Sequence, residues 1–66
     1  MDIFEMYKKF DRKKVRITDI DGQVFEGEAL FDTDYETDKD YIDIHYEDKN
    51  YITCIFIDEI ASIELI

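Results

Sequence analysis

Six acidic side chains alternate along the middle of the chain, and this spacing is its clearest chemical pattern. They match the oxygen-ligand positions 1, 3, 5, 7, 9 and 12 of a calcium-binding loop: Asp32, Asp34, Glu36, Asp38, Asp40 and Asp43. However, Thr37 stands where such a loop needs glycine for its sharp turn, and Asp43 replaces the bidentate glutamate. Alternating acids also arise on a solvated hairpin tip, so we expect no bound metal ion here.

A thiol and an imidazole form the second candidate. Cys54 and His45 lie diagonally on one sheet face if the turn between their strands is centred between Asp48 and Lys49. Such a pair could act as a nucleophile, but no oxyanion donor or glycine-rich loop accompanies it. A free cysteine in an apolar strand is usually a small buried hydrophobe. We therefore expect no catalytic residues, no enzymatic activity and no cofactor.

Tyrosines flank the acidic stretch. Tyr35 and Tyr41 could form an acidic and aromatic surface that receives a cationic side chain such as lysine or arginine. The alternative is that they pack at the rim of the domain, with their rings buried and their hydroxyls in water.

Charge is distributed unevenly along the chain. Residues 1–16 contain six basic and three acidic residues, whereas residues 17–66 contain two basic and fifteen acidic ones, and the net charge is −10. The basic cluster from Lys8 to Arg16 could hold a phosphate or the acidic wall of a neighbour, but we favour the simpler interpretation of a solvated helix end. The overall charge disfavours nucleic-acid binding and favours either a second copy or a basic protein as partner.

The hydrophobic pattern predicts one helix and five short strands. The period is helical over about 2–10 and alternates thereafter, which predicts strands at about 14–20, 23–31, 41–46, 51–57 and 62–66. Asp21-Gly22 predicts a tight hairpin, Gly27 predicts a bend inside a strand, and residues 32–40 are expected to form a loop or a frayed hairpin tip. The isoleucines at 57, 60 and 63 suggest a 3₁₀ turn that carries the chain across a bent sheet and closes a small barrel.

Size and composition limit the class of protein. A chain of 66 residues with one cysteine is expected to be a single, cytoplasmic domain without disulfide bonds. No apolar run approaches the ~20 residues of a membrane span, so we expect no membrane partner. Domains this small often need self-association to be stable. Residues 51–57 are apolar on both faces of the expected strand, so we expect another chain to cover the face that the core does not.

The order of these elements resembles the Sm-like small barrels, a family within the SH3-like folds. The resemblance is carried by a helix, then Val15 and Ile17, Asp21-Gly22, Phe25 and Gly27, Phe31-Asp32, and the closing run from Ile55 to Ile63. It implies a mainly β fold, in which a short N-terminal helix precedes a strongly bent five-stranded antiparallel sheet.

The resemblance also implies assembly into a ring or dimer, because subunits of that family pair the fourth strand of one copy with the fifth strand of the next. In this chain, the corresponding segments are 51–57 and 62–66. The expected interface residues are Tyr51, Thr53, Ile55, Phe56, Ile57, Ile63 and Leu65. The family's RNA-binding positions fall at Phe31, Asp32, Asp58 and Glu59. The expected asparagine is missing there, and two acids replace the Arg-Gly pair, so we do not expect RNA binding.

Two functions remain open on the sequence alone. The leading hypothesis is a non-enzymatic, Sm-like scaffold or interaction module that assembles through edge-strand pairing. The alternative is an acidic decoy or inhibitor that occupies a basic groove of a partner protein. Weak RNA binding is the third and least favoured hypothesis.

Overall fold

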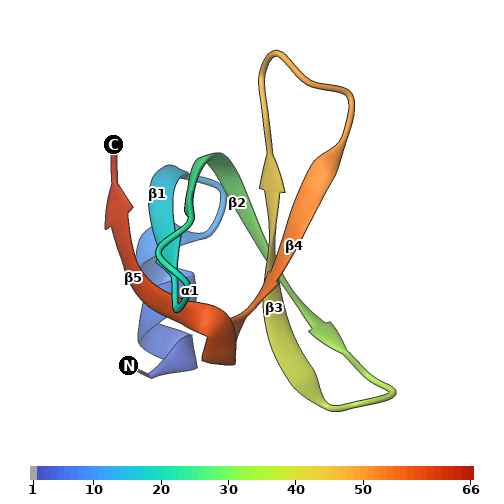
Figure 1. Ribbon diagram of the computed structural model, residues 1–66. Coiled ribbons are helices and arrows are strands. Elements are labelled where there is room, and N and C mark those ends of the chain that lie inside the picture. The colour runs from blue at the N-terminus through green and yellow to red at the C-terminus, as the bar shows by residue number, and fades with distance from the viewer. Residues whose placement is uncertain (1) are drawn as a thin grey trace.

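One helix precedes a five-stranded antiparallel sheet in the computed structural model, which describes residues 2–66 (Figure 1). The elements are α1 (Ile3–Phe10), β1 (Lys14–Asp19), β2 (Val24–Asp34), β3 (Lys39–His45), β4 (Ile52–Phe56), the 3₁₀ turn η1 (Ile57–Glu59) and β5 (Ile60–Leu65). The strands lie in the order β4-β3-β2-β1-β5. The predicted mainly β class is confirmed, and most of the predicted elements differ from the observed ones only at their ends.

Helix α1 is held in place by both of its ends. The Asp2 carboxylate accepts a hydrogen bond from a backbone N–H of the first turn at 3.0 Å, which caps the helix. Met6 and Phe10 lie on the buried face. Beyond the helix, the Asp11 carboxylate accepts the backbone N–H of Phe31 at 3.0 Å and so ties the end of the helix to β2.

Strand β2 bends at Gly27, as the sequence predicts. Its first part pairs with β1, where Val15 faces Gly27, and its second part pairs with β3, starting at Glu28 opposite His45. A Cβ atom placed on Gly27 would lie only 2.5 Å from the carbonyl oxygen of His45. Only glycine therefore lets β2 approach the backbone of β3 closely enough to turn from one partner to the other.

The predicted Asp-Gly hairpin connects β1 to β2. Gly22 has φ +83°, a left-handed conformation that glycine adopts without strain. The Asp19 carboxylate accepts the backbone N–H groups of Asp21 and Gln23 at 2.9 and 2.8 Å, so it organises the turn. The backbone N–H of Ile20 donates to the carbonyl oxygen of Glu59 at 2.9 Å, which links this turn to η1.

The predicted 3₁₀ turn is confirmed, and η1 carries the chain from one edge of the sheet to the other. Strand β4 lies at one edge, whereas β5 lies at the opposite edge and pairs with β1. Among residues 2–66, β4 and β5 do not pair with each other, so the sheet is strongly bent but not closed. The expectation of a closed barrel is not met in the single chain.

The core lies between the helix and the concave face of the sheet. Its members are apolar and come from all five strands and the helix: Met6, Phe10, Val15, Ile17, Ala29, Ile42, Ile44, Ile55 and Ile63. These residues fall at alternate positions along each strand, so the opposite face of the sheet is left to polar and partly exposed side chains. No helix within residues 2–66 is long and apolar enough to cross a membrane.

Candidate interaction surfaces

The acidic stretch 32–40 forms the end of the β2–β3 hairpin, as one of the two expectations had it, but it is mostly regular strand rather than a loop or a frayed tip. Strand β2 continues to Asp34 and β3 begins at Lys39, leaving residues 35–38 as the turn. The pairing is regular, with Asp32 opposite Tyr41 and Thr33 opposite Asp40. Cross-strand partners thus extend the hairpin through a segment whose own composition suggests irregular structure.

This hairpin separates the six acids of the calcium-like spacing. Alternation along β2 places Asp32 and Asp34 on the convex face of the sheet, whereas Asp40 lies opposite Thr33 on the other face and accepts its hydroxyl at 2.7 Å. The Asp34 carboxylate accepts the backbone N–H of Glu36 at 3.0 Å, so it serves the turn. Within residues 2–66, no group of three or more acidic, histidine or cysteine side chains is placed to hold a metal ion.

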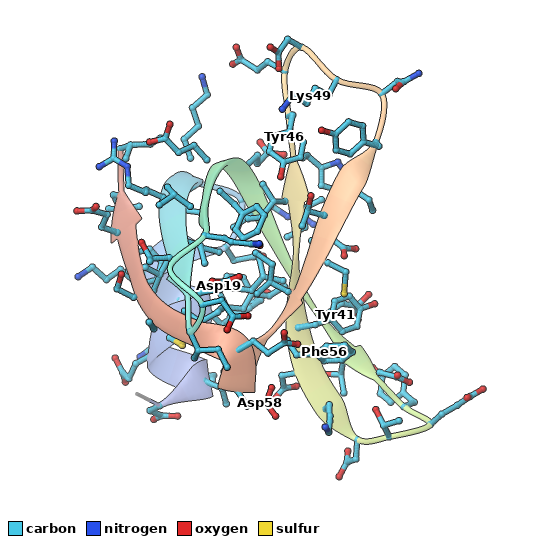
Figure 2. The ribbon with its side chains drawn as sticks, viewed as in Figure 1. Asp19, Tyr41, Tyr46, Lys49, Phe56 and Asp58 are labelled. Carbon is cyan, nitrogen blue, oxygen red and sulfur yellow. The ribbon has the colours of Figure 1, made fainter. Side chains whose placement is uncertain are left out.

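The convex face near this hairpin contains a groove of about 540 Å³, which we call the acidic–aromatic groove. Three aromatic residues and three acidic residues line it, together with Thr33 and Cys54: Tyr35, Tyr41, Phe56, Asp34, Glu36 and Asp43. Tyr41 of β3 faces Phe56 of β4, and their ring centroids are 5.9 Å apart in an edge-to-face arrangement (Figure 2). The structure thus brings Tyr35 and Tyr41, singled out in the sequence, to one surface.

The groove has a negative electrostatic environment. The pKa of Tyr41 is raised, first because its hydroxyl is partly withdrawn from water and then because of the charges of Asp32 and Asp43. The pKa of the Cys54 thiol is also raised, by desolvation first and by Asp43 second. The Tyr41 hydroxyl and the Cys54 thiol therefore both resist losing a proton, as expected where a further negative charge is unfavourable.

A cation of the chain itself already lies beside the groove. The ammonium of Lys39 is 6.0 Å from the centroid of the Phe56 ring and 3.9 Å from a carboxylate oxygen of Asp58 in η1. Lys39 is not among the residues that the sequence pattern singles out, although a lone lysine within a run of acids is a signal that could identify it.

Cys54 and His45 lie on the same face of the sheet, in the diagonal arrangement that the sequence predicts. Cys54 faces Asp43 and His45 faces Ile52 on the neighbouring strand. Cys54 is exposed, so the expectation of a buried thiol is wrong; the alternation of β4 turns Ile55 inward and Cys54 outward. Because its thiol pKa is raised, Cys54 has the opposite of the activation that a nucleophile requires.

The two edges of the sheet form the second candidate surface. Both edge strands expose large apolar side chains, since Ile52 on β4 and Leu65 on β5 are each 50% exposed. Strand β4, with the sequence ITCIF, has no charged residue, and β5 has only Glu64. Edge strands normally carry charged residues, proline or other features that block pairing. Strand β4 has no charged residue and no proline, whereas β5 carries the exposed Glu64.

The expected interface residues fall into two groups in the structure. Tyr51 and Leu65 are exposed, and Phe56 lies half-buried on the convex face beside Tyr41. The remaining four pack toward this chain's own interior: Thr53, Ile55, Ile57 and Ile63. Ile55 is only 5% exposed, so its side chain already belongs to the core of the single chain. The chain itself covers the inner face of β4, whereas Ile52 and Cys54 on the outer face are exposed.

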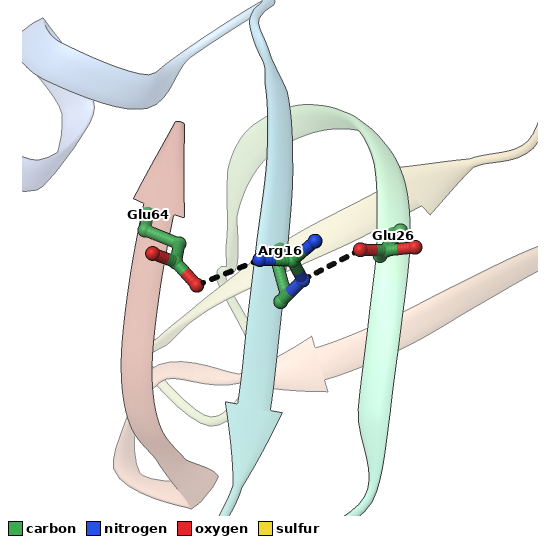
Figure 3. Close-up of polar contacts among 3 residues, drawn as sticks. All are labelled: Arg16, Glu26 and Glu64. Carbon is green, nitrogen blue, oxygen red and sulfur yellow. Dashed lines mark hydrogen bonds and ion pairs between the residues drawn. The ribbon is translucent and has the colours of Figure 1, made fainter. Parts of the chain in front are cut away.

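The basic cluster is largely engaged by acids of the same chain. Arg16 on β1 bridges both neighbouring strands, with its Nε 2.6 Å from Glu26 of β2 and its Nη1 3.1 Å from Glu64 of β5 (Figure 3). Lys14 pairs with Glu47, which raises the pKa of the lysine and lowers that of the glutamate. These residues therefore hold the sheet together rather than form an open basic patch.

The positions that correspond to the RNA-binding motifs of Sm-like proteins lie on two elements, with Phe31 and Asp32 on β2 and Asp58 and Glu59 on η1. The Phe31 ring packs edge-to-face on Tyr7 of the helix, with centroids 5.9 Å apart. Asp58 and Glu59 lie exposed on η1, where Asp58 is close to Lys39. The negative charges on η1 disfavour a phosphate at this place.

Comparison of the chain with protein-family models, with curated proteins and with solved structures found no match. The geometry of the groove and of the two edges is therefore the basis for any statement about function.

Proposed function

We propose that this protein is a non-enzymatic interaction module that assembles with copies of itself by pairing β4 of one subunit with β5 of the next. The observation that carries the proposal is that edge strand β4 has no charged residue and that both edges expose a large apolar side chain, Ile52 on β4 and Leu65 on β5. The three inner strands each contain three or more charged residues, whereas β4 contains none. A chain selected to remain monomeric would place its charges in the opposite way.

The small size of the chain supports the same proposal. Domains below about 70–80 residues rarely obtain more than about 3–5 kcal/mol from their own core, and self-association is one common remedy. Pairing β4 with β5 would satisfy edge backbone groups and cover Ile52 and Leu65, both half-exposed in the single chain. The bent sheet and the crossing by η1 also agree with the Sm-like architecture that the sequence suggests.

The test is the mass of the particle in solution, measured by size-exclusion chromatography with light scattering. We expect a multiple of 8.0 kDa at micromolar concentration, and we expect Ile52→Lys or Leu65→Lys to reduce it to the mass of one chain. Ile20→Lys is the matched control, because Ile20 is equally apolar and exposed but lies in the β1–β2 turn. A wild-type protein that runs as an 8.0 kDa monomer would refute the proposal.

Phe56→Glu is also expected to weaken the assembly, because it places a charge on β4. Ile55→Lys is not a valid test of the interface, since Ile55 belongs to the core and its replacement would unfold the subunit. An Ile52→Lys variant that stays folded and assembled would show that the interface lies elsewhere.

The second candidate is an acidic protein that occupies a basic groove of a partner protein. Its support is the excess of acids over bases in residues 17–66 together with the acidic–aromatic groove. Capture of a basic partner that weakens steeply with added salt would favour it, whereas salt-insensitive capture would argue against it.

A further inference from the structure

The acidic–aromatic groove combines two features that recognise the same chemical group. Tyr41 and Phe56 provide aromatic faces, and Asp34, Glu36 and Asp43 provide carboxylates around them. A guanidinium group stacks on an aromatic ring with its flat face and donates paired hydrogen bonds to carboxylates with its edge. The compact ammonium of lysine uses such a combination less well, because it has no flat face to stack.

We propose that this groove is a docking site for an arginine side chain, presented by an extended segment of a basic partner protein. The groove has a volume of about 540 Å³ and is open to solvent, so an arginine side chain can enter it from the convex face. Charge complementarity favours a basic segment, since the chain carries a net charge of −10. Tyr35, which is 87% exposed on the hairpin turn, can close over the bound side chain.

The position of Lys39 supports a cation at this place. Its ammonium already lies over the ring of Phe56 and near Asp58, so a cation of the chain itself already contacts an aromatic residue of the groove. At 6.0 Å from the ring centroid this contact is at the outer limit of a cation–π interaction, so an incoming guanidinium can displace it. Lys39 thus acts as an internal competitor of the arginine.

A second copy of this chain is a less suitable source of the arginine. Arg16 is held between Glu26 and Glu64, which leaves the exposed Arg12 as the arginine that a second copy can present. A second copy also brings a net charge of −10 towards the acidic groove, whereas a basic partner brings the opposite sign. The proposal goes beyond edge-strand assembly, and all residues that line the groove belong to one chain. Because Cys54 and Phe56 lie on β4, which the proposed assembly also uses, the oligomeric state has to be measured for each groove variant.

The test measures binding of capped Gly-Arg-Gly by chemical-shift changes in the amide NMR spectrum. The same peptide with citrulline is the neutral isostere, and Gly-Lys-Gly is the ammonium analogue. We expect saturable shifts at Tyr41, Asp43 and Phe56 with the arginine peptide, weaker binding of the lysine peptide and none of the citrulline peptide. Equal binding of the citrulline peptide would overturn the proposal.

Variants with matched controls separate the groove from general charge attraction. Phe56→Leu is expected to weaken binding by about two- to fivefold, the effect of losing one exposed cation–π contact, whereas Tyr51→Leu at the other hairpin is not. Asp43→Asn should weaken binding more than Asp48→Asn, which removes the same charge from the β3–β4 turn. Equal losses in the two aspartate variants would show unspecific attraction and refute the site.

Removal of the internal cation gives the sharpest result. Lys39→Gln should strengthen binding of the arginine peptide, because it frees the face of Phe56. Lys49→Gln is the control, since it makes the same charge change at the other hairpin, where Lys49 lies over Tyr46 at 4.8 Å. If both variants strengthen binding equally, Lys39 is no competitor and the site as proposed is wrong.

Two further measurements identify the occupant. The oligomeric state of each variant is recorded, so that loss of assembly is distinguished from loss of the groove. The amide spectrum of the Arg12→Gln variant is also compared with that of the parent protein, both without peptide. If the variant no longer self-associates and its groove signals differ from those of the parent, the arginine in the groove comes from a second copy. That result overturns the proposal of a partner segment.

Discussion

Replacement of Gly27 by alanine tests the bend on which the whole architecture depends. The added Cβ would lie 2.5 Å from the carbonyl oxygen of His45 and 2.8 Å from Cγ2 of Ile44, whereas real Cβ contacts essentially never fall under 3.0 Å. The oxygen would have to move by about 0.5 Å to reach even that limit. It belongs to the backbone of β3, which is paired on both sides and cannot move freely.

The magnitude follows from this lack of freedom. Overpacking of a rigid site costs about 1–3 kcal/mol. A core of this size contributes no more than about 3–5 kcal/mol, so the substitution removes a large part of the total stability. With a urea dependence of about 1 kcal/mol per molar for a small domain, the midpoint of unfolding should fall by about 1–3 M.

The assay is urea unfolding followed by far-ultraviolet circular dichroism, with Gly22→Asn as control. Gly22 has no atom within 4 Å of an added Cβ, so only the strain of its positive φ opposes a substitution. Asparagine tolerates that region better than most residues, so we expect a smaller loss of stability than for Gly27→Ala. A Gly27→Ala protein that unfolds at the same urea concentration as the parent would show that β2 does not approach β3 as described.

Two further predictions concern side chains on the convex face. Cys54 should react with iodoacetamide at pH 8 more slowly than a free thiol, because its raised pKa keeps the thiol protonated. Asp43→Asn should speed the reaction, because it removes the second cause of the raised pKa. An unchanged rate in that variant would show that Asp43 does not act on the thiol. Arg16→Gln should increase amide hydrogen exchange in β5 and lower the urea midpoint, with a smaller effect in high salt, since it removes the bridge to Glu26 and Glu64; a loss independent of salt would point to packing instead.

Local signals in the sequence were sufficient for most of the fold. The helical period from Ile3 to Phe10, the Asp21-Gly22 turn and the glycine at 27 each predict a feature that the structure confirms. The spacing of the isoleucines correctly indicates the crossing by η1. These features depend on residues close together in the chain, which is why pattern and turn chemistry identify them.

Features that depend on cross-strand partners were not predictable in the same way. The acids at 32–40 suggest a loop, but pairing with β3 makes most of them strand residues. Cys54 was expected inside and is exposed, because the direction of alternation in a uniformly apolar strand cannot be read from the strand alone. The acidic–aromatic groove was foreseen only through Tyr35 and Tyr41, since Phe56 and Lys39 join it through the register of β4 and the position of η1.

The pairing of β1 with β5 has a consequence for how the molecule folds. Val15 of β1 lies opposite Leu65 of β5. Strand β1 is therefore synthesised early but can pair with β5 only after the last residues of this segment have left the ribosome. The three hairpins between β1 and β4 bring together neighbours in sequence and can form first, but Ile17 remains uncovered until Ile63 arrives. Such long-range closure is slow, so the nascent chain passes through a period in which chaperones or premature association can capture it.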